Sequence, residues 1–160
     1  MRELLFQGLV LSFFFLLSFA AGGIGGRFIS SSIYSWYVNL NKPSWNPPNW
    51  VFSPVWTFLY FCMSLAAWLV WWRTGLSVGL GPLFLFGLNL LLNVAWSGLF
   101  FGLRNPKIAF AEIILLWGSI LATLIWFWTI SPPAGLLMLP YLLWVTFATG
   151  LNFTIWRLNP

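Results

Sequence analysis

Aromatic side chains recur at helical spacing in this sequence and bring several ring systems onto one surface. Phe52, Trp56 and Tyr60 follow one another at intervals of four residues, so they share one face of a helix. Indole and phenol rings arranged in this way hold flat apolar molecules by stacking. With 13 Trp and 17 Phe in 160 residues, the chain is rich in such groups. The pattern favours a binding site for a planar hydrophobic ligand.

Two further segments carry groups that can complete such a site. Asn89 and Asn93 are four residues apart and share a helix face with Trp96. A buried Asn is costly inside a membrane unless it has a partner. Each amide is therefore either a hydrogen-bonded link between helices or a donor that lines a cavity. The second segment places three residues on one side of a helix, namely Tyr141, Trp144 and Ala148.

The residue types that usually carry catalysis are scarce. The chain contains no His and no Asp, and its acidic residues are Glu3 and Glu112. This excludes a His general base, a carboxylate pair, a Ser-His-Asp arrangement and most zinc sites, and we expect neither a metal nor a cofactor. Glu112 is either a structural anchor near a helix start or the one carboxyl that a small proton-coupled exporter would use within the membrane.

The elements that position these residues follow from composition. The chain is 61% hydrophobic and 6% charged, and nine charged side chains cannot form the polar surface of a soluble domain. This composition indicates an integral membrane protein in contact with the lipid bilayer. The net charge of +5 comes from isolated residues without a basic run, so we expect no nucleic-acid partner.

Five apolar stretches are each long enough to cross a bilayer as a helix. We predict one all-α domain over residues 1–160, a five-transmembrane-helix bundle. Its predicted helices cover residues 4–24, 50–72, 82–103, 108–130 and 136–156. The first stretch is longer than the apolar core of a signal peptide, so we expect it to remain as a helix.

The basic residues predict the orientation of this bundle. Arg2 and Arg73 fall on the side of the N-terminus, and five others fall on the opposite side: Arg27, Lys42, Arg104, Lys107 and Arg157. Because loops on the cytoplasmic side carry the excess of Lys and Arg, we expect the C-terminus in the cytoplasm. The expected location is a bacterial inner membrane.

The first loop, residues 27–49, is the one long connection, and long loops in compact proteins are usually functional or disordered. It contains Trp36, Tyr37 and Trp45, and it is stiffened by prolines, so disorder is not expected. Two interpretations are open: a structured lid over the helix bundle, or a belt of aromatic residues at the lipid headgroups.

The motifs in and after this loop are similar to those of the TspO/MBR family, the translocator proteins or tryptophan-rich sensory proteins. The resemblance begins at Trp36-Tyr37 and continues through KPSWNPP at Lys42–Pro48 and FSPVWTFLY at Phe52–Tyr60. Later matches are NVAWS at Asn93–Ser97, PYLLW at Pro140–Trp144 and IWRLN at Ile155–Asn159. They run in the family's order from about Trp36 onward.

The resemblance implies a pocket between the helices, covered by the first loop, that binds porphyrins and similar flat apolar ligands in a sensing, regulatory or transport role. By motif position, its lining residues are Tyr37, Pro47, Trp56, Asn93, Trp144 and Ala148. Some members promote light- and oxygen-dependent porphyrin breakdown with two pocket tryptophans, which match Trp56 and Trp144. This activity is the alternative function, with those two residues in the catalytic role.

Two partners remain to be considered. The sterol motif of the family has Tyr where this chain has Phe153, a departure that argues against cholesterol binding. Pairs of small residues four apart, such as Gly22 with Gly26 and Gly98 with Gly102, allow helices to pack closely. Such pairs serve packing within the bundle or a homodimer.

Overall fold

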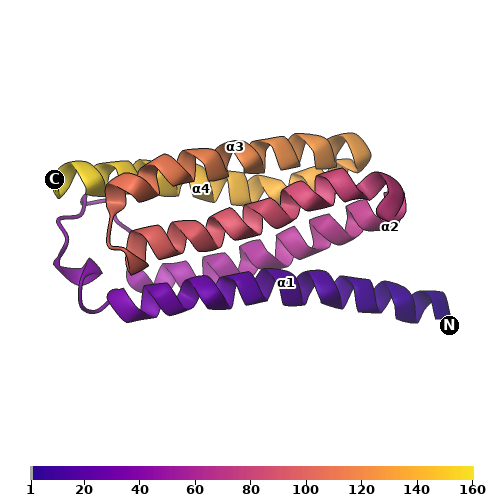
Figure 1. Ribbon diagram of the computed structural model, residues 1–160, viewed down its shortest axis with the longest axis horizontal. Coiled ribbons are helices and arrows are strands. Elements are labelled where there is room, and N and C mark those ends of the chain that lie inside the picture. The colour runs from indigo at the N-terminus through magenta and orange to yellow at the C-terminus, as the bar shows by residue number, and fades with distance from the viewer. Residues whose placement is uncertain (1) are drawn as a thin grey trace.

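The computed structural model of the protein describes residues 2–160, without the side chains of residues 76 and 77. Its elements are α1 (Arg2–Ser32), η1 (Tyr37–Asn39), α2 (Asn49–Ser97), η2 (Gly98–Gly102), α3 (Pro106–Ile130) and α4 (Pro132–Leu158). η1 is a 3₁₀ turn and η2 is a short π-helix. Figure 1 shows the long helices side by side in one bundle, with the two termini at opposite ends.

Five helical segments are long and apolar enough to cross a membrane, as predicted. Three are α1, α3 and α4, and the other two belong to α2. We call them span 2 (Asn49–Gly75) and span 3 (Val78–Gly102, which includes η2). The chain reverses between them at Gly75, whose φ of 62° lies in the left-handed region that glycine adopts without strain. The five-helix bundle predicted from the sequence is thereby confirmed.

The first helix extends further than predicted. Gly25, Gly26 and Arg27 do not end it, and α1 continues to Ser32, so the connection to α2 covers residues 33–48 rather than 27–49. A glycine inside a helix costs only about 1 kcal/mol relative to alanine. An unpaired backbone group in the bilayer costs several times more, and this difference keeps the segment helical. The residues 33–48 are called the lid below.

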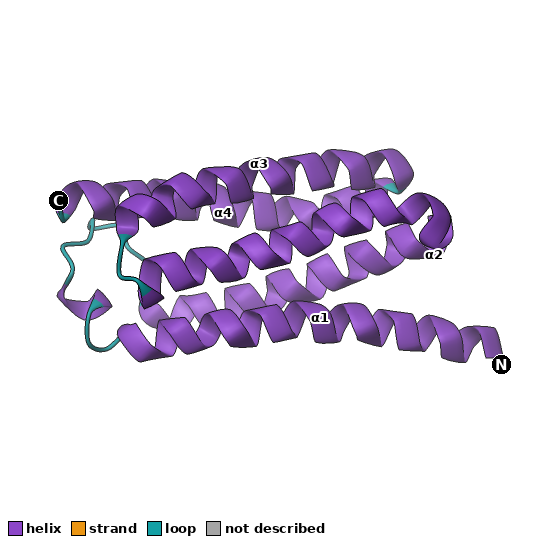
Figure 2. Cartoon of the chain, in the orientation of Figure 1, coloured by secondary structure: helices purple, strands orange, loops and turns teal. Residues whose placement is uncertain are grey.

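Proline and short polar residues set the starts of the last two helices. Asn105 caps α3, because its Oδ1 accepts a hydrogen bond from the Ile108 N–H at 3.1 Å, and Pro106 takes the first helical position. Pro132 begins α4 directly after Ser131, so only one residue separates α3 from α4. Figure 2 shows that the lid and the connection from η2 to α3 lie at the same end of the bundle.

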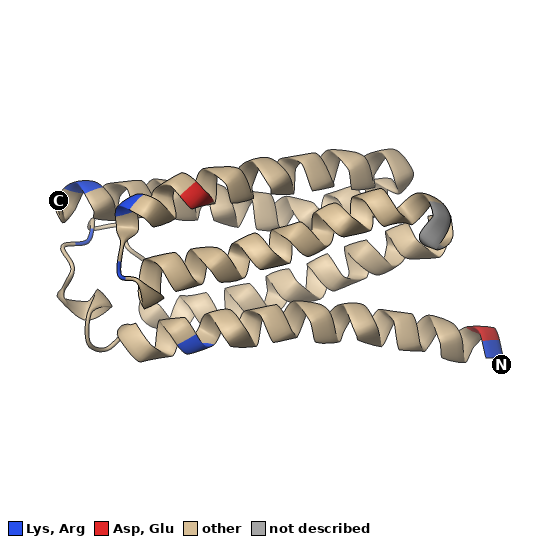
Figure 3. Ribbon diagram, viewed as in Figure 1, with Lys and Arg blue, Asp and Glu red and all other residues tan. Residues whose placement is uncertain are grey.

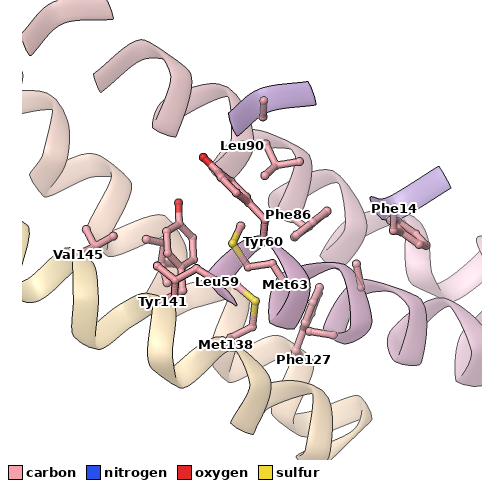
Figure 4. Packing of buried hydrophobic residues seen from close by; sticks show 14 of the residues in the cluster. Phe14, Leu59, Tyr60, Met63, Phe86, Leu90, Phe127, Met138, Tyr141 and Val145 are labelled. Carbon is pink, nitrogen blue, oxygen red and sulfur yellow. The ribbon is translucent and has the colours of Figure 1, made fainter. Parts of the chain in front are cut away.

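The core is apolar at its centre and polar at a few fixed points. Figure 4 shows Tyr60 and Met63 of span 2 beside Phe86 of span 3 and Met138 and Tyr141 of α4. A second, smaller cluster lies under the lid, around Tyr37, Phe100 and Phe101. The candidate site is found where these two clusters meet.

Candidate functional site

Two adjoining hollows lie at the lid end of the bundle. The first, which we call the cavity, is narrow, with about 50 Å³ of space open to a water-sized sphere. It is lined by Ile29, Ile33, Tyr37, Phe52, Trp56, Trp96, Phe100, Phe101, Trp144, Phe147, Ala148, Leu151, Asn152 and Ile155. The structure therefore places four of the six predicted lining residues around one space, namely Tyr37, Trp56, Trp144 and Ala148.

The second hollow, the side groove, is roomier, with about 520 Å³ of such space, and lies between α1, span 2 and the end of span 3. It is lined by Phe19, Gly22, Gly23, Gly25, Gly26, Ile29, Ser30, Ile33, Tyr34, Asn49, Phe52, Ser53, Trp56, Thr57, Tyr60, Asn93, Trp96 and Ser97. Predicted residue Asn93 lines this groove rather than the cavity. Trp56 lines both.

The walls of the cavity are aromatic rings held by other rings. Trp56 stacks on Tyr60 with ring centroids 5.5 Å apart and an interplanar angle of 29°. Trp144 meets the edge of Phe52 at 6.0 Å, which joins α4 to span 2. Trp96 stacks on Phe100 at 5.2 Å. Because these indoles are only half-buried, each keeps ring surface for a flat apolar ligand.

The two asparagines of span 3 have different roles. Asn89 links span 3 to α3, since its Nδ2 donates to Thr123 Oγ1 at 2.7 Å and its Oδ1 accepts from Ser119 Oγ at 2.5 Å. Asn93 joins two tyrosines from other helices: its Oδ1 accepts from the Tyr60 hydroxyl at 3.0 Å, and its Nδ2 donates to the Tyr141 oxygen at 3.2 Å. Asn93 thus fixes Tyr60, the ring on which Trp56 stacks.

Sequence reasoning missed Asn152 as a site residue. It lines the cavity and is 1% exposed. Its Oδ1 accepts from Trp96 Nε1 at 3.0 Å, and its Nδ2 donates to the Pro106 carbonyl at 2.8 Å. Asn152 therefore orients one indole of the cavity wall. The signal for it was present, because an Asn within a predicted span needs a partner.

The lid is a folded cover with its own hydrogen bonds. Tyr37 is 3% exposed, and its hydroxyl donates to Asn46 Oδ1 at 2.9 Å. Burial raises the pKa of Tyr37 to about 12, against the opposing effect of the Asn46 hydrogen bond. Lys42 Nζ donates to three carbonyls at the end of η1: Tyr37 at 2.7 Å, Leu40 at 2.9 Å and Val38 at 3.2 Å. Its ammonium is thus committed to the lid.

The lid is fastened to α4. The Asn41 N–H donates to Asn159 Oδ1 at 3.0 Å, and Asn159 Nδ2 donates to the Asn41 carbonyl at 2.9 Å. Trp45 also meets Phe147 edge-on at 5.7 Å. Pro47, the remaining predicted residue, lies in the lid, where its carbonyl accepts from Asn46 Nδ2 at 3.0 Å. It is not among the residues that line either hollow. These contacts favour the lid interpretation over an aromatic belt.

Glu112 stands apart from the site. It is 9% exposed, it lines neither hollow, and its carboxylate oxygens have no hydrogen-bond partner within residues 2–160. The sequence predicts more basic residues at the end of the bundle that carries the first loop. Figure 3 agrees, because most of the visible Lys and Arg lie towards the lid end. A ligand in the cavity or groove therefore lies near the more basic end of the bundle.

Comparison with known proteins gives a consistent result. The sequence model of the TspO/MBR family matches residues 14–157. The tryptophan-rich protein TspO of Chlorobaculum tepidum is 44% identical over 148 residues, which cover 90% of this chain and 92% of that protein. The human translocator protein is 41% identical over 138 residues, 85% and 82% of the two chains. The tryptophan-rich sensory protein of Cereibacter sphaeroides is 45% identical over 124 residues, 78% and 77% of the two chains.

Proposed function

Because the chain belongs to the TspO/MBR family, we propose that it is a multi-pass membrane receptor for porphyrins and similar flat apolar ligands, with a sensing, regulatory or transport role. The observation that carries the proposal is the aromatic cavity beneath the fastened lid, which shares a wall with the roomier side groove. In it, Trp56, Trp96 and Trp144 come from three different helices and keep ring surface towards one space. Stacking between such rings suits a planar macrocycle better than a flexible chain.

Each predicted site residue has a distinct part in this proposal. Trp56, Trp144 and Ala148 form walls of the cavity, and Tyr37 forms part of its roof. Asn93 acts through Tyr60, and Pro47 acts through the lid. The carboxylates of a porphyrin would meet Arg27 or Arg104 at the basic end, because the Lys42 ammonium is held by backbone carbonyls.

A titration of the purified protein with protoporphyrin in detergent tests this function. We expect quenching of tryptophan fluorescence at micromolar ligand. Ala148→Phe adds a ring to the cavity wall and should weaken binding about tenfold, equivalent to about 1.4 kcal/mol. Ala122→Phe, at an exposed position of α3, is the matched control. Unquenched emission in a folded sample of the unsubstituted protein would overturn the proposal.

The second candidate is light-dependent porphyrin degradation, and the placement of Trp56 and Trp144 on one cavity supports it. An indole can give an electron to an excited porphyrin. Dissolved oxygen would then add to the reduced macrocycle and break a bond of the ring, and the oxidised indole would take its electron back, so that oxygen is the net oxidant of the porphyrin. Trp56→Phe and Trp144→Phe should then retain binding but slow the light-dependent loss of the Soret band. Trp72→Phe, exposed and near the Gly75 reversal, is the control. Equal rates in all four proteins would exclude this candidate.

Location, orientation and assembly complete the proposal. Five basic residues at the lid end favour a cytoplasmic lid and C-terminus in a bacterial inner membrane. A green fluorescent protein fused to the C-terminus should therefore fluoresce, which requires folding in the cytoplasm. A homodimer stays a prediction, which native mass spectrometry in detergent would test. Cholesterol is left out of the proposal because Phe153 packs on Phe110 and Trp156, away from the cavity.

A further inference from the structure

We infer that the side groove is the entrance through which the ligand of the cavity passes sideways from the bilayer, between α1 and span 2. The inference rests on the proposed function, since it concerns the same ligand. It adds a second contact surface, outside the cavity, for a flat apolar molecule dissolved in the membrane. Its basis is the position, the width and the floor of the groove.

The groove and the cavity share a wall. The same five residues line both hollows: Ile29, Ile33, Phe52, Trp56 and Trp96. These side chains are all apolar or aromatic, and Trp56 and Trp96 are half-buried. Movement of the Trp56 ring away from Tyr60 would therefore join the two spaces without breaking a hydrogen bond.

The groove is open along the membrane-facing side of the bundle. Its rim residues Gly23, Ser53 and Thr57 are exposed. From Phe19 to Ser30 it follows α1 for about 16 Å, at a rise of 1.5 Å per residue. This length reaches from the lid end towards the middle of the bilayer. A molecule dissolved in the hydrocarbon region can reach the groove without crossing the lid.

The width of the groove comes from missing side chains on α1. A Cβ at Gly22 would lie 2.5 Å from Tyr60 Cε2, so α1 rests on the Tyr60 ring at this point. A Cβ at Gly23 or at Gly26 would meet nothing within 4 Å. The space beside these two residues is therefore free, and larger side chains there would narrow the groove without a clash.

The chemistry of the groove suits an amphiphilic planar molecule. Its part farther from the lid carries Phe19, Trp56 and Tyr60, whereas its end near the lid carries exposed hydroxyl and amide groups of Ser30, Ser53 and Asn49. Arg27 is exposed and shares a helix face with Gly23 and Ser30. A macrocycle with acidic substituents would thus keep its charged edge at the lid end.

Compared with the groove, a route through the lid is closed. The reciprocal Asn41–Asn159 hydrogen bonds and the Trp45–Phe147 contact hold the lid on α4. Tyr37, itself a lid residue, packs its buried ring against Phe101, and its bond to Asn46 keeps the lid folded. Passage from the lid side requires these contacts to break together, whereas passage through the groove requires a ring to move.

Stopped-flow measurement of protoporphyrin binding to the protein in lipid nanodiscs tests the inference. Gly26→Leu narrows the groove outside the cavity. A narrower entrance raises the barrier for passage in both directions, so kon and koff should fall by the same factor, about tenfold, while Kd stays constant. Gly23→Leu provides a second, independent variant with the same expectation. Gly8→Leu on α1 and Gly118→Leu on α3, both at open positions outside the groove, should leave both rates unchanged.

Three results would overturn the inference that the side groove is the entrance. Unchanged rates in both groove variants, with faster binding in Asn159→Ala, would place the route at the lid. A raised Kd with unchanged kon would make the groove part of the final binding site instead of its approach. Absence of binding to the unsubstituted protein would overturn the proposed function and the entrance with it, and this result differs from the other two because no rate would be measurable. Circular dichroism of each variant confirms that it is folded.

Discussion

The two helices on either side of the site, α4 and α1, are held in place in different ways. α4 is fixed by side-chain hydrogen bonds to three other elements: Tyr141 to span 3, Asn152 to Trp96 and Pro106, and Asn159 to the lid. Within residues 2–160, two such bonds tie α1 to the rest, Ser32 Oγ to the Phe101 carbonyl and Ser64 Oγ to the Phe14 carbonyl. Elsewhere α1 is held by packing, with close approaches at Gly22 and Gly25 and aromatic contacts such as that of Phe14 with Phe86.

This difference shows how a membrane protein can be rigid and still admit a ligand. Hydrogen bonds between helices have strict geometry, so α4 keeps the cavity wall and the lid in register. Packing contacts with few polar links allow small sliding or tilting movements at lower cost. A helix bundle with one wall held by hydrogen bonds and another held by packing has a defined pocket and one side that can open. The following substitutions test this contrast.

The largest effect is expected at the α1 contact with Tyr60. Gly22→Val places a side chain where even a Cβ would lie 2.5 Å from the ring. Overpacking of this kind costs about 3 kcal/mol, so the variant should unfold at a clearly lower temperature in detergent. Gly23→Val, where the space is open, is the control. Equal stability of the two variants would show that α1 yields more readily than its packing indicates.

The next effect concerns the α4 wall. Asn152→Ala leaves the Trp96 N–H and the Pro106 carbonyl without their buried partner. We expect a loss of about 2 kcal/mol in the free energy of unfolding and weaker protoporphyrin binding, since the Trp96 ring loses its anchor. Thr154→Ala, at a half-buried position whose hydroxyl donates to the Gly150 carbonyl of the same helix, controls for the mutation itself. Unaltered binding with lowered stability would limit Asn152 to a structural role.

A smaller effect is expected at the junction of α4 and the lid. Asn159→Ala removes the side chain that makes both hydrogen bonds to the Asn41 backbone. The free energy of unfolding should fall by about 1 kcal/mol. Hydrogen–deuterium exchange should become faster in residues 33–48 and stay unchanged in span 3. Asn39→Ala, which removes a bond within the lid, is the matched control. Exchange in the lid that is unaffected by Asn159→Ala would mean that other contacts hold it.

The smallest effect at neutral pH is expected from Tyr37→Phe. The folded-state pKa of Tyr37 is about 12, whereas the ordinary value is 10.0. Between these two values the unfolded chain loses a proton that the folded protein keeps, so this contribution to stability is complete below pH 10 and disappears as the pH rises towards 12. The variant lacks this dependence. Its stability should be slightly lower than that of the parent at pH 8 and should fall less steeply above pH 10, which denaturation curves at several pH values would measure. Parallel curves would contradict the assignment.

The helical fold followed from the sequence because hydropathy and length are local properties. Apolar stretches of 20 residues or more have few alternatives in a bilayer, and the Gly75 reversal follows from a short break. The boundary at Gly25–Arg27 was wrong because a glycine weakens a helix by only about 1 kcal/mol, and because Arg27 marks the end of the apolar stretch rather than the end of the helix. The extra turns of α1 make the lid shorter than predicted and place Arg27 on the helix.

The site was partly accessible from the sequence. The spacing of Phe52, Trp56 and Tyr60 correctly placed these rings on one face, and the stacking of Trp56 on Tyr60 is its direct consequence. The bonds of Asn152 to Trp96 and Pro106 join residues about 50 positions apart, and no local pattern contains them. The side groove depends on which face α1 presents to span 2, which a sequence without homologues does not determine.

The pairing of Asn41 with Asn159 also orders events during synthesis. The lid emerges from the ribosome after the first span, but the residue that fastens it follows the fifth. Because membrane proteins are made and inserted from the N-terminus onward, the roof of the cavity stays unfastened until the last helix has entered the bilayer. An incomplete chain that lacks Asn159 would therefore leave the lid loose over the aromatic interior.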